Sequence, residues 1–170
     1  MIYILDAYNV IHKIPALESL LDQNLRSARD ALIALSSRLL LRRADLTQII
    51  LVFDGKSAYR DLPQHAPPKI KIIFSETPET ADEKIVEILE GLSGERDKCV
   101  VSDDNFVRNH AKAYAARVVS VAEFERLTQQ TKTRPGKMSP SDGLADKLTP
   151  KQAEEITRAY KKSIDEKYKP

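Results

Sequence analysis

The sequence has a single cysteine, so no disulfide can form within the chain. Cys99 lies inside an apolar run, and we expect it to be a small buried core residue. No hydrophobic run is long enough to cross a bilayer. The N-terminus also lacks the basic segment that precedes the apolar part of a signal peptide. These absences argue against a membrane protein or a disulfide-stabilised secreted protein, and they favour a cytoplasmic location.

Motifs of several enzyme classes are also missing. The sequence contains no Gly-x-x-x-x-Gly-Lys-Ser/Thr, Gly-x-Gly-x-x-Gly or Gly-x-Ser-x-Gly pattern. Tyr8 stands two residues after Asp6, which disfavours an aspartyl-phosphate phosphatase of the Asp-x-Asp type. A cysteine inside a strand is a poor nucleophile. The three histidines, His12, His65 and His110, lack metal-ligand spacing and are expected at the surface or in packing.

The charge of the chain is nearly balanced but unevenly distributed. Hydrophobic residues make up 42% and charged residues 31% of the 170 residues, which predicts one globular domain with an ordinary core. The net charge of +2 indicates no particular partner. Residues 131–170 hold ten basic and six acidic residues, whereas residues 1–130 hold 17 and 19. The basic C-terminal segment is explained either by a polyanionic partner or by a solvated tail.

Short apolar runs alternate with amphipathic segments through the first 130 residues. The apolar runs predict five buried strands, at residues 2–5, 48–53, 70–74, 99–102 and 117–120. Periodicity and two capping boxes predict helices at about 25–43, from Thr80, at 106–114, and from Ser120 to about 130. A short connection is expected at residues 11–21.

The alternation predicts an α/β fold, a three-layer sandwich with helices on both faces of a mostly parallel five-stranded sheet. The expected strand order is about 3-2-1-4-5, with the opening strand in the centre. The long helix at 25–43 should place its arginines on its outer surface, at positions 26, 29, 38, 42 and 43. Residues 131–148 are predicted to be a linker, and residues 149–170 a basic C-terminal helix.

Acidic residues gather at one edge of the predicted sheet. Asp6 and Asp54 end the first and second strands, Asp103 and Asp104 follow the fourth, and Asp82 opens the helix after the third. The carboxyl ends of parallel strands share one edge, so these side chains should converge. Each could separately be a turn or capping residue. A cluster of like charges, however, needs a cation near neutral pH, and oxygen ligands favour Mg²⁺ or Mn²⁺. These ions hold phosphates and activate water for attack on phosphorus.

Four segments carry a family resemblance: Asp6-Ala-Tyr-Asn9, Val52-Phe-Asp54, Glu79-Thr-Ala-Asp-Glu83 and Val101-Ser-Asp103. Together they resemble the YacP-like branch of the NYN domains, relatives of the PIN-domain nucleases. The resemblance covers roughly residues 1–130 and implies a PIN-like fold with metal-dependent endoribonuclease activity. Bacterial members are linked to turnover of messenger RNA on ribosomes. Many NYN proteins have Ser-Gly-Asp-x-Asp-Phe after the fourth strand, whereas here Asn105 stands in place of the second acid.

The resemblance also implies roles for individual residues. Asp6, Asp82 and Asp103 would be the principal metal ligands, with Asp104 as an additional candidate. Asn9 would orient Asp6 or a metal-bound water. Asp54 would contact the ion directly or through a neighbouring ligand.

RNA contacts are expected from the long loop at residues 55–69, in which Gly and three prolines disfavour regular structure. Lys56, Tyr59 and Arg60 in this loop would bind RNA by phosphate contact and stacking. The alternative is a solvated loop without a partner. His12 lies close enough to Asn9 to touch a substrate.

The leading hypothesis is therefore an endoribonuclease that uses Mg²⁺ or Mn²⁺ to hydrolyse RNA, with messenger RNA as the expected substrate and the ribosome as a candidate partner. A second hypothesis is a non-catalytic RNA- or ribosome-binding module of the same fold. The two differ in whether Asp6, Asp82 and Asp103 lie close enough to share an ion. A third is a phosphatase that acts on a small phosphorylated substrate. The sequence predicts no oligomeric state.

Overall fold

The structure is a computed structural model that describes residues 1–55, 67–76, 78–95 and 97–129. The predicted RNA-binding residues Lys56, Tyr59 and Arg60 lie outside these ranges, and so do the predicted linker and C-terminal helix. Those assignments stay predictions. The described residues form the elements β1 (Ile2–Asp6), α1 (Ala7–Lys13), α2 (Pro15–Glu18), α3 (Leu25–Arg42), β2 (Gln48–Phe53), β3 (Ile70–Phe74), α4 (Ala81–Gly91), β4 (Lys98–Val101), α5 (Asn105–Ala113), β5 (Arg117–Val119) and α6 (Val121–Gln129).

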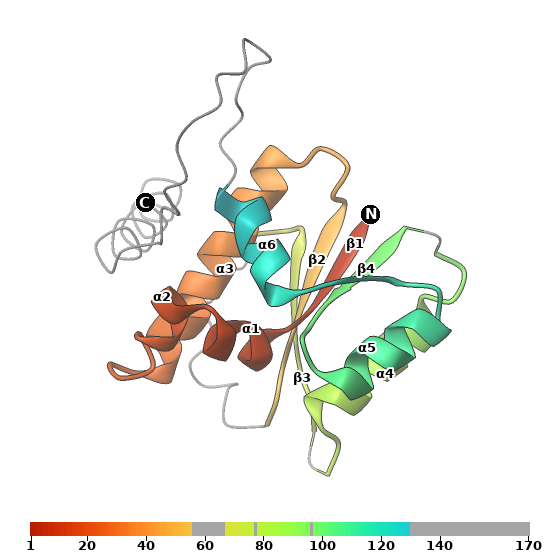
Figure 1. The fold of residues 1–170 in the computed structure, drawn as a ribbon, viewed down its shortest axis with the longest axis horizontal. Coiled ribbons are helices and arrows are strands. Elements are labelled where there is room, and N and C mark those ends of the chain that lie inside the picture. The colour runs from red at the N-terminus through yellow and green to blue at the C-terminus, as the bar shows by residue number, and fades with distance from the viewer. Residues whose placement is uncertain (56–66, 77, 96, 130–170) are drawn as a thin grey trace, which may run out of the picture.

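The five strands form one sheet in the order β3-β2-β1-β4-β5, and every neighbouring pair is parallel (Figure 1). The predicted order and the central position of β1 are confirmed. In the register of the sheet, Ile4 lies opposite Ile50 on one side and Val100 on the other. Tyr3, Ile4 and Leu5 have no exposed surface, as expected for a strand buried on both faces.

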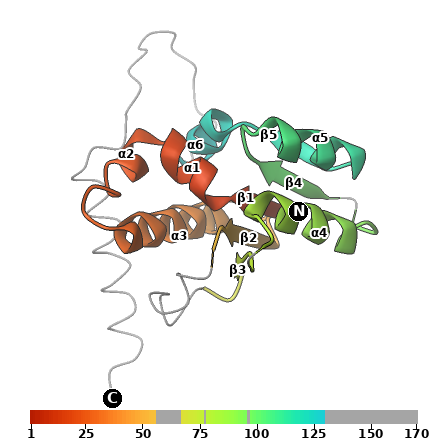
Figure 2. The ribbon, with the colours of Figure 1, turned by 90° about the horizontal axis from the view of Figure 1, so that it is seen from below.

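Helices cover both faces of the sheet, which confirms the three-layer prediction (Figures 1 and 2). Helices α1, α2, α3 and α6 lie on one face, where Leu5 and Leu32 belong to one buried cluster. Helices α4 and α5 lie on the other face, where Ile4, Ile85 and Val107 form a second cluster. The alternation of side chains along β1 supplies both clusters, so the central strand connects the two cores.

The segment after β1 differs from the prediction, because it forms two helices where a connection was expected. Asp6 caps α1 by accepting a hydrogen bond from the backbone N–H of Asn9 at 3.2 Å. Pro15 occupies the first turn of α2, where its missing N–H costs nothing. Helix α1 has only seven residues, fewer than the window of about 11–18 residues over which helical periodicity can be recognised in a sequence.

Arg29 is a second correction, since it was expected on the outer surface of the long helix. Its side chain is buried, with 3% of its surface exposed. Ala28 and Leu32 beside it are buried as predicted, and Ile33, one turn further on, is buried too. The inward face of α3 is therefore wider than a simple three- and four-residue spacing indicates. Leu25, expected in the core, is 38% exposed at the start of the helix.

Cys99 is fully buried in β4, as predicted. Burial raises the pKa of its thiol to about 11, so the thiolate is scarce at neutral pH. In the described part of the chain, no helix combines the length and the hydropathy needed to cross a membrane.

Candidate active site at the carboxyl end of the sheet

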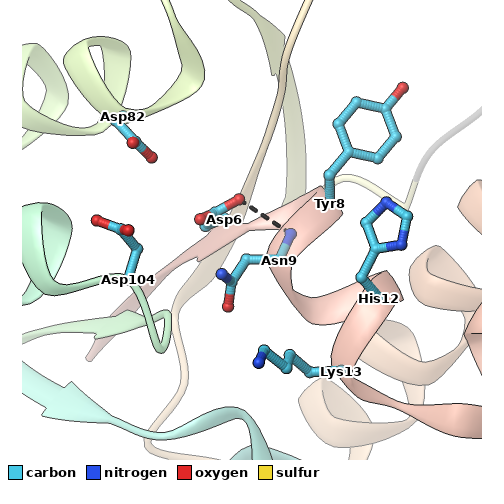
Figure 3. Close-up of a pocket in the computed structure, with 7 residues that line it drawn as sticks. All are labelled: Asp6, Tyr8, Asn9, His12, Lys13, Asp82 and Asp104. Atoms are coloured by element: carbon cyan, nitrogen blue, oxygen red, sulfur yellow. Dashed lines mark hydrogen bonds between the residues drawn. The ribbon is translucent and has the colours of Figure 1, made fainter.

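An open pocket of about 290 Å³ lies at the carboxyl end of the sheet. Its lining comes from β1, α1, α4 and the turn before α5, and consists of Asp6, Tyr8, Asn9, His12, Lys13, Asp82 and Asp104. Figure 3 shows the carboxylates of Asp6, Asp82 and Asp104 facing a common space, with the side chains of α1 on the other side. The sheet topology thus brings three carboxylates from separate β-α units to one pocket, as the sequence predicted for Asp6 and Asp82.

Asp6 lies deepest among these acids and is 7% exposed. Its Oδ1 accepts from the backbone N–H of Asn9, and its Oδ2 accepts from the Ser102 hydroxyl at 3.1 Å. Burial raises the pKa of Asp6 to about 6, and the nearby charges of Asp82 and Asp104 add to the shift. The two hydrogen bonds act in the opposite direction, because they stabilise the ionised form. Asp6 is therefore ionised at neutral pH at a cost in stability.

Asp82 enters the pocket from the first turn of α4. The capping box predicted for this helix is present, since Thr80 and Glu83 exchange hydrogen bonds between side chain and backbone. Burial raises the pKa of Asp82, and the charges of Asp104, Asp54 and Glu83 raise it further. These shifts mean that the acids at this edge lie close enough to repel one another.

Asp104 occupies the third acidic position of the pocket and also caps α5. Its Oδ1 accepts from the backbone N–H groups of Phe106 at 2.7 Å and Val107 at 3.1 Å. The backbone N–H of Asp104 donates to Ser102 Oγ at 3.0 Å. The Ser102 hydroxyl therefore connects Asp6 with the loop that carries Asp104, and it is fully buried. This serine was not among the predicted site residues.

Asp103, predicted as a principal ligand, is not among the residues that line the pocket. Its Oδ1 accepts from the backbone N–H of Val121 at 3.2 Å and lies 3.9 Å from the Arg108 guanidinium. Its carboxylate thus joins the β4–α5 loop to the start of α6. Asp104, the next residue, lines the pocket in its place.

Asn9 holds the two halves of the site together. Its backbone N–H donates to Asp6, while its side-chain Oδ1 accepts from the backbone N–H of Asp103 at 3.0 Å. We predicted that Asn9 would orient Asp6, and the contact to Asp6 is made by the main chain. The side chain instead fixes the loop that presents Asp104.

Asp54 lies at the end of β2, close to the pocket without lining it. Its Oδ1 accepts from the hydroxyl of Ser75 at 2.8 Å, and that hydroxyl also accepts from the backbone N–H of Gly55 at 3.2 Å. The effect of its charge on the pKa of Asp82 is the only described link between Asp54 and the acids of the pocket. The geometry favours an indirect role over direct contact with an ion.

Among the described residues, no three acidic, histidine or cysteine side chains stand close enough to hold a metal ion together. The chemistry of the three pocket carboxylates nevertheless fits a hard cation, because they are oxygen donors with mutual repulsion to relieve. Mg²⁺ usually keeps several waters and binds through one or two carboxylates plus substrate phosphates. In that mode Asp6, Asp82 and Asp104 would share the ion, one or two of them directly and the rest through its waters.

Sequence reasoning missed Tyr8 and Lys13, both of which line the pocket. They could have been found if α1 had been predicted, because helical spacing places Tyr8 with His12 and Asn9 with Lys13. Lys13 and His12 are exposed, and they add cationic or titratable groups to an otherwise acidic pocket. A pocket that contains both cationic and acidic side chains suits a substrate whose phosphate is bound beside the acids.

Comparison with known proteins agrees with this fold. The chain matches the YacP-like NYN domain over residues 3–168. It resembles the crystal structure of a single-residue mutant of Rae1 (YacP) from Bacillus subtilis, with 26% identity and a TM-score of 0.62 over 75% of this chain and 74% of that one. A second crystal structure of Rae1 (YacP) from the same organism gives 22% identity and a TM-score of 0.61, over 98% and 80% of the two chains.

A comparison with curated proteins finds no match. The family match spans nearly the whole chain and extends beyond the first 130 residues, to which the motif resemblance applied. From this match, the chain belongs to the YacP-like NYN domain family, a family of PIN-like nuclease domains.

Proposed function

We propose that this protein is a metal-dependent endoribonuclease that hydrolyses phosphodiester bonds of RNA in the pocket at the carboxyl end of β1. The observation that carries the proposal is the meeting of three carboxylates, from Asp6, Asp82 and Asp104, in one pocket. The raised pKa values of Asp6 and Asp82 support it, because ionised carboxylates are kept together at a cost in stability that a structural role does not require. Membership of a nuclease family supports the same conclusion.

The residues of the pocket divide into three roles. Asp6, Asp82 and Asp104 would hold Mg²⁺ or Mn²⁺, which supplies charge neutralisation at the phosphate and a more acidic bound water. Ser102 and Asn9 position Asp6 and the Asp104 loop through the hydrogen bonds described above. Lys13 and His12 contact the phosphate backbone of the substrate on the opposite wall.

Asp104 takes the ligand role that the motif resemblance assigned to Asp103. The support is positional, since Asp104 lines the pocket while the carboxylate of Asp103 bonds the start of α6. A messenger RNA substrate, an association with the ribosome and a cytoplasmic location belong to the same proposal. They follow from the family resemblance and from the basic C-terminal segment.

A second candidate function is a non-catalytic RNA-binding module of the same fold. One observation favours it, namely that no three potential metal ligands among the described residues converge closely enough to hold an ion together. In that case the acids would serve only to cap and orient loops, as Asp103 does. The RNA would then be held by the cations of α1 and by the basic C-terminal segment.

Cleavage of a labelled single-stranded RNA, measured with Mn²⁺ and with EDTA, separates the two functions. The nuclease should cleave only with the metal, and Asp6→Asn and Asp104→Asn should each lower the rate by at least about 100-fold, as loss of charge stabilisation at a reacting centre does. Glu90→Gln serves as a matched control, because Glu90 is exposed on α4 away from the pocket lining. Undiminished cleavage by both aspartate variants, or cleavage in EDTA, would overturn the proposal.

A further inference from the structure

Tyr8 is an aromatic residue that the proposed chemistry does not use, although it lines the same pocket as the three acids. It is half-buried, and it lies one helical turn before His12 on α1. Figure 3 shows its hydroxyl directed away from Asp6, Asp82 and Asp104. The Tyr8 hydroxyl is therefore not placed to exchange a proton at the carboxylates, and what the residue offers the pocket is its ring.

The hydroxyl of Tyr8 accepts hydrogen bonds from the side chain of Arg29 on α3. Arg29 Nε donates to Tyr8 Oη at 3.1 Å, and Arg29 Nη2 donates to the same oxygen. The guanidinium carbon lies 5.6 Å from the centroid of the Tyr8 ring, beyond the hydroxyl end of that ring. Arg29 therefore fixes the ring at its end and leaves the ring faces uncovered by the guanidinium.

Arg29 is an unusual residue to bury, since only 3% of its surface is exposed. Its guanidinium carbon lies 5.6 Å from the centroid of the Phe53 ring and 6.0 Å from that of Phe74. Among the described residues no acidic side chain forms an ion pair with it, so aromatic rings and one hydroxyl form its described surroundings. Burying a charge in this way is costly, whereas a leucine at this position would pack at no such cost.

The packing of Tyr8 restricts its ring further. Phe53 meets it edge-on, with centroids 5.4 Å apart and an interplanar angle of 75°. Phe53 stacks in turn on Phe74 at 5.4 Å. The ring is thus held by Phe53 at the end of β2, by the buried cluster against which it packs and by Arg29 at its tip, while part of the residue lines the pocket. A preorganised aromatic ring loses little conformational entropy when a flat ligand stacks on it.

From these contacts we propose that Tyr8 is a stacking surface for one unpaired base of the RNA substrate, next to the phosphate held at the acids, and that Arg29 is the residue that positions Tyr8. This inference rests on the proposed function of the pocket in binding RNA. A base inside a duplex is already stacked on its neighbours, so the substrate at this point must be single-stranded. Aromatic stacking accepts every base, so no strong sequence preference is expected from Tyr8.

The test compares the full-length protein with its Tyr8 variants in binding short labelled RNAs. Each RNA is single-stranded and lacks one base at a successive position. Fluorescence anisotropy with Ca²⁺ measures affinity while a hard cation neutralises the acids, and gel electrophoresis checks that the RNA stays intact. At one position the missing base should weaken binding to the unmodified protein by about 5- to 100-fold, the loss that one stacked base gives. Tyr8→Leu should bind intact RNA more weakly by the same factor, and removal of the base at that position should not weaken its binding further.

Three further variants separate positioning from folding. Tyr8→Phe keeps the ring and should retain the sensitivity to the missing base. Arg29→Met should lose most of that sensitivity, and Arg29→Lys, which can still donate to the hydroxyl, should restore part of it. Thermal melting checks that each variant is folded. The decisive result is a folded Tyr8→Leu whose RNA affinity no longer depends on the missing base.

The proposal would be overturned if Tyr8→Leu responded to missing bases as the unmodified protein does. If the unmodified protein still cleaves RNA with metal, that outcome does not affect the proposed nuclease function. The converse result is that the missing base weakens binding to the unmodified protein and not to Tyr8→Leu, while no metal-dependent cleavage is detected. That result would overturn the proposed function and leave the role of Tyr8 standing. The two failures are therefore distinguishable.

Discussion

The ionised carboxylate of Asp6 opposes folding. Its pKa of about 6 in the folded protein lies above the ordinary value of 3.8, mainly because the residue is buried. The folded state therefore binds a proton more tightly than the unfolded state does. The resulting loss of stability develops as the pH rises from about 3.8 to 6 and is complete above that range. Residues that lower stability in this way are often retained for function.

Replacing this carboxylate should stabilise the protein at neutral pH. We expect Asp6→Asn to raise the free energy of unfolding at pH 7.5 by about 1–3 kcal/mol in the absence of metal, because an amide keeps the shape without the buried charge. At pH 3.5 most of the gain should vanish, since Asp6 is then neutral in the folded state and largely neutral in the unfolded state. Urea denaturation at the two pH values measures the difference. An Asp6→Asn protein no more stable than the parent at pH 7.5 would contradict the buried-charge interpretation.

Ser102 offers a second prediction for a single residue. Its hydroxyl contacts both Asp6 and the backbone N–H of Asp104, so Ser102→Ala should weaken Mn²⁺ binding by about 10- to 100-fold, as loss of a residue that orients a ligand does. Ser75→Ala is the matched control, because its hydroxyl contacts Asp54 beside the pocket. Isothermal titration should show a much smaller change for Ser75→Ala, and equal effects of the two variants would rule out a special role for Ser102.

The sequence predicted Asp6 and Asp82 among the pocket acids, but for the third acid it favoured Asp103 and gave Asp104 only as an additional candidate. Asp6 follows a buried strand and Asp82 follows a capping box, and both signals are local. The choice between Asp103 and Asp104 depends on how one loop turns after β4, and that turn is set by Ser102 and by the start of α6. Contacts between residues far apart in sequence cannot be read from spacing alone.

At the scale of secondary structure, sequence reasoning missed α1 and α2, and with α1 it missed Tyr8 and Lys13. The turn residues Asp6 and Asn9 suggested a loop, whereas Asp6 acts as the cap of a helix. The burial of Arg29 escaped prediction for a related reason. An arginine on a long helix is usually exposed, and the position of Arg29 is explained by the Tyr8 hydroxyl and by the aromatic residues at the ends of β2 and β3.

Helix α5 ends with a residue in an unfavourable backbone conformation. Ala115 has φ of 54°, in the left-handed region that glycine adopts without steric cost. Ala115→Gly should therefore raise the free energy of unfolding by roughly 0.5–1 kcal/mol. Ala113→Gly, within the last turn of the same helix, should lower it. Chemical denaturation of both variants checks the opposite signs, and a destabilising Ala115→Gly would contradict the assigned backbone conformation.

At the scale of the whole molecule, the order of the strands and the two helical layers were predicted correctly. The reason is that apolar runs at positions 48–53 and 70–74 coincide with β2 and β3, and parallel β-α units allow few topologies. The C-terminal segment is different, since its sequence predicts a basic helix that either docks on the body or waits for a partner. That assignment remains a prediction.

The basic C-terminal segment should contribute to RNA affinity mainly through phosphates. We expect replacing Lys161, Lys162 and Lys167 by Gln to make the dependence of RNA affinity on salt less steep, by about 0.7 in the logarithmic slope for each phosphate that is no longer neutralised. A control protein with Gln at the exposed body residues Lys71, Lys112 and Arg126 should keep the original slope. Anisotropy titrations over a range of salt concentrations compare them. Equal slopes for both variants would exclude the segment from RNA binding.

The most direct test of the metal site is a titration with Mn²⁺, in which electron paramagnetic resonance reports the free ion. The unmodified protein should bind Mn²⁺ at neutral pH, and binding should be abolished in Asp6→Asn and weakened by at least about tenfold in Asp104→Asn. Asp103→Asn should bind nearly as well as the unmodified protein, because the Asp103 carboxylate bonds the start of α6. If Asp103→Asn abolished binding while Asp104→Asn did not, or if the unmodified protein bound no Mn²⁺, the pocket of Asp6, Asp82 and Asp104 would not be the metal site.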